Sequence, residues 1–426
     1  MVNEDQNIDD KQENGQHPTR SGLFRWLGRI LMFIGILLVA VVMLLQLSSV
    51  QTWLSSKVTK YISEATNTTV QAERLKISPF DGIVLHNFSI TGQKNDTLIS
   101  GEALNISLRK NLFFLINKQL DLSYLGIRNI RLNILTENGE SRSNLIKFID
   151  NLSTNPNKTK GKPLDLKVKE IDLAEIRVRI DNRNKGVLQS IDLTSGNILL
   201  EFMDLECKEF IITSIVLDRP AFQKHTYEYE CNIDDELTVL QRELKTEEKP
   251  GEPLNLTLRE LAIRDGRFGI SNGLLVTEEK YKNYLDYNNF SFEKINLLLT
   301  DLRIKNDFDL TAKLEDLVAT DNTGFEIRHI SCDTILMDRS NTELRGLMVD
   351  LGQSKVSHFF KLSYGDFSAF SDFVNKVILT AHLENSVVRM DDLMHFVRGL
   401  SRVPVVQHNR NELINLSGRY FGKVNN

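Results

Sequence analysis

The pattern of apolar and polar residues changes near residue 67 of this 426-residue chain. Before that point, residues 30–47 form an uncharged apolar run, and no charged residue lies between Arg29 and Lys57. At about 1.5 Å of rise per residue, roughly 20 helical residues cross the hydrocarbon layer of a bilayer, so this run is long enough to span it. After residue 67, apolar and polar residues alternate with the period of two that is typical of a β-strand with one apolar face.

The apolar run predicts a transmembrane anchor over residues 20–49. Arginines precede the run, and they collect on the cytoplasmic side of membrane spans, so the polar tail 1–19 is expected in the cytoplasm, disordered, with the bulk of the chain on the far side. The alternatives are a cleaved signal peptide, whose apolar region of about 7–15 residues is usually shorter, and a buried core helix. The residues expected to form the anchor and its flanks are Arg25, Arg29, Ile30, Leu37, Leu44 and Trp53.

An amphipathic membrane-proximal helix is predicted over residues 50–66, because Leu54, Val58, Tyr61, Ile62 and Ala65 recur at helical spacing. Two placements are open for it. Its apolar stripe lies on the bilayer surface, or the helix caps the end of the β structure that follows.

The remainder is expected to be mostly β, an elongated and curled sheet with short helical inserts. Roughly 25 strands, each about 4.8 Å from the next, would give a sheet on the order of 100 Å long. The inserts are expected at residues 111–116, at 143–152 with Ser143 as N-cap, near 366–377, and at 391–400 behind a cap formed by Asp391 and Asp392.

Residues 163–182 align without a gap on residues 253–272, at an offset of 90. In both copies the alternation changes phase: Val168 is followed by Ile171 in the first copy, and Leu258 by Leu261 in the second. The phase then changes back, at Ile176 in the first copy and at Phe268 in the second. A phase change indicates a bulge or tight turn that returns the apolar face to the same side. Together with polar linkers at 154–163 and 245–253, the repeat predicts an N-terminal β segment (67–153), a first β repeat (154–244) and a second repeat with further strands (245–426).

Charge and motifs exclude several classes of function. The net charge of −5 comes from interspersed acidic and basic residues, which leaves no basic stripe for nucleic acid. Cys207, Cys231 and Cys332 lack metal-ligand spacing, and no phosphate loop, GxSxG elbow or HExxH occurs. We therefore expect no catalytic residue, no metal site and no cofactor.

One apolar face per strand fits two architectures. In a closed sandwich the apolar faces of two sheets bury each other, whereas in an open groove the face stays available to a ligand such as a lipid chain. Periodicity is the same in both cases. The residues expected on a groove floor are Leu164, Leu166, Val168, Leu254, Leu256, Leu258, Phe268 and Ile270.

The segment 79–90, then 103–109 leading into 111–116, and then 127–134, resembles the N-terminal part of the AsmA-like TamB family of diderm bacteria, inner-membrane subunits of a translocation and assembly module. The apolar pattern of residues 254–268 is similar to the family's recurring strand pair. The resemblance implies a single-pass protein of the bacterial inner membrane, with the N-terminus cytoplasmic and a long β groove in the periplasm. It also implies an Omp85-type outer-membrane partner, reached through a C-terminal region that this sequence lacks.

Three functions follow as hypotheses. The resemblance, with the absence of a nucleotide-binding motif, favours passive conduction of phospholipid between the two membranes, with the acyl chains in the groove. The second is a scaffold that assembles outer-membrane or secreted proteins by pairing with their strand edges. The third is an anchored adhesion or receptor ectodomain made of closed sandwiches.

Overall fold

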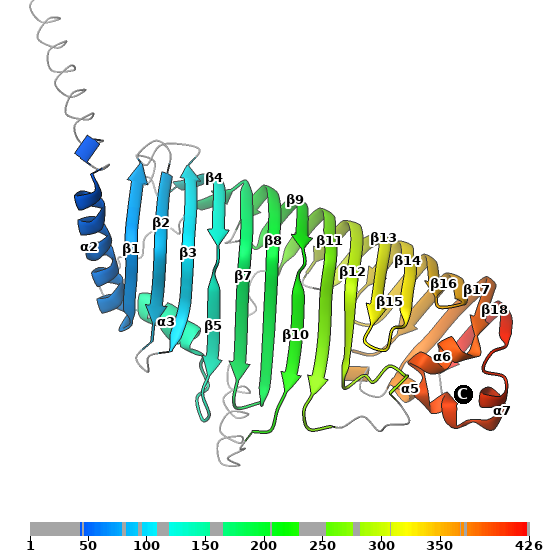
Figure 1. Cartoon of the computed structure of the whole chain (residues 1–426). Coiled ribbons are helices and arrows are strands. Elements are labelled where there is room, and N and C mark those ends of the chain that lie inside the picture. The colour runs from blue at the N-terminus through cyan, green and yellow to red at the C-terminus, as the bar shows by residue number, and fades with distance from the viewer. Residues whose placement is uncertain are drawn as a thin grey trace, which may run out of the picture.

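The computed structural model describes residues 43–44, 47–78, 82–92, 96–108, 119–153, 165–204, 207–229, 253–275, 282–306, 308–366, 368–369 and 373–423. Within these ranges the fold is mostly β, as predicted, and all 18 strands belong to one mixed sheet. Figure 1 shows the strands side by side from β1 at one end to β18 at the other, and many of them bend along their length.

The strands are β1 (Thr69–Ser78), β2 (Gly82–Thr91), β3 (Thr97–Leu108), β4 (Gln119–Arg128), β5 (Arg131–Thr136), β6 (Asp165–Val168), β7 (Glu170–Asn182), β8 (Val187–Asp204), β9 (Glu209–Asp218), β10 (Ala221–Thr226), β11 (Asn255–Asn272), β12 (Phe290–Lys305), β13 (Asp309–Asp321), β14 (Glu326–Met337), β15 (Asn341–Leu351), β16 (Ser354–Ser363), β17 (Ile378–Arg389) and β18 (Leu413–Lys423). The helices are α2 (Ser48–Thr66), α3 (Asn144–Ser153), α5 (Phe373–Lys376), α6 (Met390–Phe396), a 3-10 helix (Arg398–Arg402) and α7 (Pro404–His408).

Three positions across the sheet are each shared by two consecutive strands. β4 and β5 follow one another along one line, as do β6 with β7 and β9 with β10, so 18 strands occupy 15 positions. At about 4.8 Å per position, the sheet is about 70 Å long. It is shorter than the expected 100 Å because single strands reach 18 residues, in β8 and β11.

The 90-residue repeat of the sequence recurs in the strand pairing. Arg131 pairs with Arg177 in parallel, and Ala221 pairs with Arg267 in the same way, which is the same contact displaced by 90 residues. The remaining pairs from β11 to β18 are all antiparallel.

The second predicted phase change of each copy coincides with a left-handed backbone position. Glu175 has φ 55° and Asp265, its equivalent at the 90-residue offset, has φ 51°. Neighbouring positions on the adjacent strands, Asn129 and Arg219, have φ 49° and 51°, and their backbone N–H groups donate to the residues that precede Glu175 and Asp265. A row of bulges therefore crosses the sheet where the strands bend, and the apolar side chains return to the same side after it.

Helix α2 covers the β1 end of the sheet, and the helix predicted over 50–66 is confirmed. Two of its polar side chains form hydrogen bonds with the backbone of β1. The Ser55 hydroxyl donates to the carbonyl of Ala72 (3.2 Å), and the Val70 N–H donates to the Ser63 hydroxyl (2.9 Å). These bonds satisfy backbone groups at an edge that would otherwise be open to another strand.

The helical inserts predicted at 143–152 and 391–400 are present as α3 and α6, but the N-cap of α6 differs from the prediction. α3 begins after Ser143, whose hydroxyl accepts from the Ile146 N–H (3.3 Å), so its predicted cap is confirmed. The predicted cap of Asp391 and Asp392 is wrong: Arg389 occupies the N-cap position, and both aspartates lie in the first turn of α6, which ends at Phe396. The Asp392 carboxylate instead accepts from the Gln353 N–H (2.8 Å) and the Ser354 hydroxyl (2.7 Å), which ties α6 to the β15–β16 turn.

The other expected segments are described only in part. In the described part of 366–377, an α-helix is present at Phe373–Lys376. The insert at 111–116, the tail 1–19 and the linker 154–163 lie outside the described residues, as does the linker 245–253 except for its last residue. The same holds for the anchor 20–49 apart from residues 43–44 and 47–49. In the described ranges, no helix combines the length and the apolar character that crossing a bilayer requires.

A substitution at the bend tests the bulge. Glu175→Val should lower the free energy of unfolding by at least about 1 kcal/mol, because a β-branched side chain is strained at positive φ, whereas Glu175→Gly should change it by less than about 0.5 kcal/mol. Arg177→Val, in extended backbone of the same strand, is the control and should be nearly neutral. Urea unfolding of the purified chain measures all three, and equal losses for the two valine variants would rule out the bulge as the cause.

Candidate functional site

The bulged strands build one continuous apolar face, hereafter the apolar face. Direct pairing places Leu256 beside Phe210 and Ile304, and the same alignment recurs strand by strand. Representative residues of this face, in order across the sheet, are Leu75, Leu85, Leu104, Ile127, Leu173, Leu217, Ile263, Leu297, Leu317, Ile330, Val349 and Val356. Each pairs directly with its neighbour, except that Leu173 and Leu217 both pair with Gly196 of β8, so their side chains share one side of the sheet.

The structure brings Val168, Leu256, Leu258, Phe268 and Ile270 of the predicted floor to this one face. Leu166 and Val168 pair with Leu120 and Leu122 of β4. Leu256, Leu258, Phe268 and Ile270 lie along β11 on the same side, and Leu254 directly precedes that strand. Leu164 lies outside the described residues.

Aromatic side chains concentrate on one part of the apolar face, over β10, β11 and β12. The rings of Phe222 and Phe268 stack with centroids 5.4 Å apart, and Phe290 lies 6.0 Å from Phe268. Phe292 meets Phe290 edge-on at 5.8 Å. These rings give a broad, adaptable contact area for an apolar ligand.

Most of the apolar face is half-exposed. Val168 and Leu258 are buried, at 7% and 3%, but Leu256, Phe268 and Ile270 are only partly covered. The one compact cluster of buried apolar residues that the described part of the chain contains is Tyr364, Ala369 and Val377, at the β18 end. In the same ranges no second sheet packs on the first, so the closed-sandwich arrangement is not formed there.

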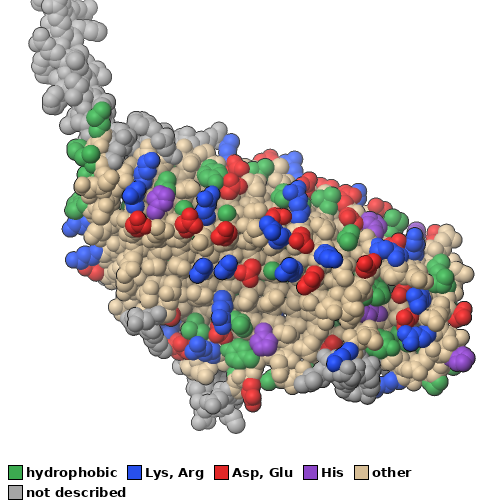
Figure 2. Space-filling model, viewed as in Figure 1, with side chains coloured by type: hydrophobic (Ala, Val, Ile, Leu, Met, Phe, Trp, Pro, Cys, Tyr) green, Lys and Arg blue, Asp and Glu red, His purple; other side chains and the backbone are tan. Residues whose placement is uncertain are grey.

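The opposite face of the sheet is polar. Figure 2 shows Lys, Arg, Asp and Glu side chains in rows across it, with few hydrophobic side chains over the middle strands. Exposed pairs on this face include Arg259 with Glu201 and Arg177 with Asp192, which contribute little to stability because water screens them. The sheet therefore separates a charged, hydrated side from an apolar side.

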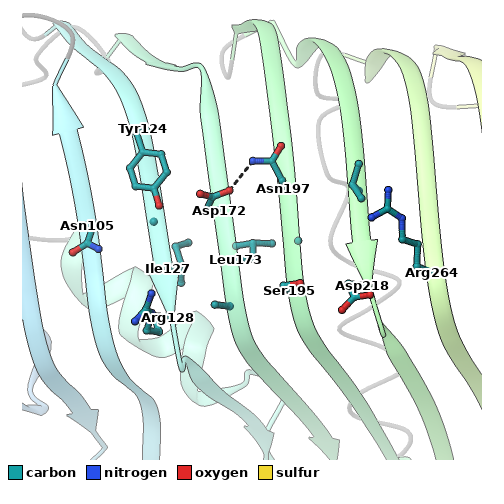
Figure 3. Close-up of a pocket in the computed structure, with 14 residues that line it drawn as sticks. Asn105, Tyr124, Ile127, Arg128, Asp172, Leu173, Ser195, Asn197, Asp218 and Arg264 are labelled. Carbon is teal, nitrogen blue, oxygen red and sulfur yellow. Dashed lines mark hydrogen bonds between the residues drawn. The ribbon is translucent and has the colours of Figure 1, made fainter.

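A shallow pocket of about 420 Å³ lies where the strands bend, and Figure 3 shows its polar lining. The Asn197 side chain donates to the Asp172 carboxylate (2.6 Å) and to Glu170 (3.0 Å). Burial, followed by a hydrogen bond to Asp172, raises the pKa of Tyr124. The described residues that line the pocket include no His, Cys or Lys.

A polar contact pins α6 to the β13–β14 turn. The His395 imidazole lies 2.6 Å from the Asp321 carboxylate, both side chains are buried, and the Phe325 ring stacks on the imidazole at 4.2 Å. Burial acts to raise the pKa of Asp321, but hydrogen bonds from His395, Thr323 and the Phe325 N–H outweigh it and hold the pKa below its ordinary value. The contact fixes the helical end of the sheet in place.

Of the predicted anchor residues, only two fall among the described residues. The side chains of Leu44 and Trp53 are 53% and 60% exposed, and Tyr61 on the same helix is 66% exposed. Arg25, Arg29, Ile30 and Leu37 lie outside the described residues. The buried side of α2 carries Gln51, Ser55 and Thr66, while Trp53, Val58 and Tyr61 are exposed.

Sequence reasoning missed the contact between β13 and α6. Asp321 and its partner His395 are 74 residues apart, and no spacing signals their contact. In the described part of the chain, no three His, Cys, Asp or Glu side chains are arranged to hold a metal ion.

No known protein-family model matches the chain, and no curated protein matches its sequence.

The contact between Asp321 and His395 predicts that the stability contributed by Asp321 depends on pH. A carboxyl whose pKa is lowered in the folded state stabilises that state above its ordinary pKa of about 3.9, and this stabilisation is lost as the pH falls through the folded-state value. Asp321→Asn should therefore lower the free energy of unfolding by about 1–3 kcal/mol at pH 7, and the deficit should shrink below about pH 4. Urea unfolding at several pH values measures it. The control is Asp309→Asn, an exposed carboxylate, and a deficit independent of pH would contradict the account.

Proposed function

We propose that this chain is a membrane-anchored β-groove protein that passively conducts phospholipid between the inner and outer membranes of a diderm bacterium, consistent with its resemblance to the AsmA-like TamB family. The apolar face is the floor of the groove and holds acyl chains, while the polar face meets the periplasm. Residues 20–49 hold the chain in the inner membrane.

The observation that carries the proposal is the unbroken, half-exposed apolar face. A phospholipid that leaves a bilayer exposes roughly 30 methylenes, and at about 0.8 kcal/mol each water opposes this by on the order of 20 kcal/mol. A face on which every strand contributes aliphatic or aromatic side chains removes much of that penalty along the whole path. No step of the path then requires a large free-energy input.

The exposed side of α2 supports a membrane-proximal position for the β1 end. Trp53 and Tyr61 are residue types that favour the membrane–water interface, and Lys57 and Lys60 are exposed on the same helix. The sequence left two placements open for this helix, on the bilayer surface or as a cap of the β structure, and both are compatible with this arrangement. The buried side of α2 caps β1, while its exposed side is free to meet lipid headgroups.

A second candidate function rests on β18. In the described part of the chain this strand pairs only with β17, and it exposes Leu413 (54%) and Phe421 (76%). An open edge with apolar side chains is a template for another strand. This favours a scaffold that assembles outer-membrane or secreted proteins, acting with an Omp85-type partner.

Two aspartate substitutions on one strand test the lipid proposal. Leu256→Asp places a charge on the apolar face and should reduce transfer of fluorescent phospholipid between vesicles at least tenfold. Thr257→Asp places the same charge on the polar face and should change transfer by less than twofold, since Thr257 alternates with Leu256. Transfer is measured with the purified full chain at equal protein concentration, and equal effects of the two variants would refute the assignment.

Photo-crosslinkers separate the two candidate functions. Incorporation at Leu256 and Phe268, which are partly exposed, should give lipid adducts in cells, whereas the almost fully buried Leu258 is unsuitable because a bulky probe would disturb packing. Client-protein adducts at Phe421 without lipid adducts at Leu256 would favour the scaffold. Adducts of neither kind would leave both proposals without support.

A further inference from the structure

Lys224 is a cation on the apolar face. It lies in β10 between Phe222, which stacks on Phe268, and Thr226, the last residue of that strand. Lys224 is half-buried, while its neighbours Gln223 and His225, which point to the polar face, are exposed. Alternation from Phe222 thus places the lysine side chain on the apolar side.

Among the described strands, no other Lys or Arg occupies the apolar face. The direct pairing partners of Lys224 are Ile270 on β11 and Gln189 on β8. No ion pair joins Lys224 to another described residue, whereas Arg177, Arg183, Arg259 and Arg345 on other strands and turns have carboxylate partners. A cation that borders an apolar surface is able to pair with the anionic part of an amphipathic ligand.

We propose that Lys224 binds the phosphate of a phospholipid whose acyl chains lie on the adjoining apolar face, an inference that rests on the proposed function. The ligand needs an apolar part and an anionic part side by side. Phe222, Phe268 and Ile270 meet the first need, and the lysine ammonium, with the Gln189 amide beside it, meets the second. Free phosphate would satisfy only the ammonium.

The location also orients the lipid. Lys224 is two residues from the end of β10, close to the rim formed by the β7–β8 turn, because Thr226 pairs with Val187, where β8 begins. A lysine stem can lie along the apolar surface while its charge reaches water at such a rim. The headgroup then stays hydrated at this rim while the acyl chains extend over the aromatic cluster.

Binding of two lipids with equal acyl chains tests the inference. The purified full chain is titrated with fluorescent phosphatidylglycerol and with fluorescent diacylglycerol, which lacks the phosphate. Lys224→Met should weaken phosphatidylglycerol binding about three- to tenfold, the effect expected of one lysine near an anionic headgroup, and should leave diacylglycerol binding unchanged. Methionine keeps the length of the side chain and suits an apolar surface, so the variant should fold.

Lys305→Met is the control, because Lys305 is exposed on the polar face of β12 next to Ile304, and it should affect neither lipid. Equal affinities of wild type and Lys224→Met for phosphatidylglycerol, or equal weakening for both lipids, would overturn the role of the lysine while leaving acyl-chain binding in place. Competition by millimolar inorganic phosphate in the wild type would also overturn it, by showing a site for free phosphate. Failure of the wild type to bind either lipid would instead refute the proposed function, and the lysine inference with it.

Discussion

The whole structure depends on keeping the apolar side chains of each strand on one side of the sheet while the strand bends. A strand has a period of two, so any single inserted residue would send the following apolar side chains into water. Residues in the left-handed region, such as Glu175 and Asp265, absorb the extra residue and restore the side. Because Asn129 and Arg219 do the same on the neighbouring strands, the bend continues across the sheet without breaking the apolar face.

This arrangement explains why the protein tolerates so much half-exposed apolar surface. Stability comes from backbone hydrogen bonds along strands of up to 18 residues and from side-by-side contacts between aliphatic residues of adjacent strands, rather than from a central core. Among the described residues, a compact apolar cluster lies near the β18 end, where Val377 is fully buried and the contact between His395 and Asp321 holds α6. The middle of the sheet is thus left available to a ligand, which is the property that the proposed lipid path requires.

Much of the fold could be predicted from the sequence because alternation is a local property. The β content, the helix over 50–66, the cap at Ser143 and the 90-residue repeat all follow from residues near one another in the chain. The apolar residues of β11 were predicted for the same reason. The pairing of Asp321 with His395 and the true partners of Asp392 depend on contacts over dozens of residues, and Lys224 becomes notable only once strand pairing shows what surrounds it.

The two ends of the sheet differ in a way that governs self-association. The hydroxyls of Ser55 and Ser63 on α2 occupy backbone groups of β1, so the first strand offers little to an incoming chain, whereas β18 has no such cover in the described residues. Head-to-tail pairing of β18 with β1 of a second copy would require α2 to leave β1 and to give up these hydrogen bonds. The helix at one end of the sheet is thus a barrier to edge-to-edge association of the whole sheet.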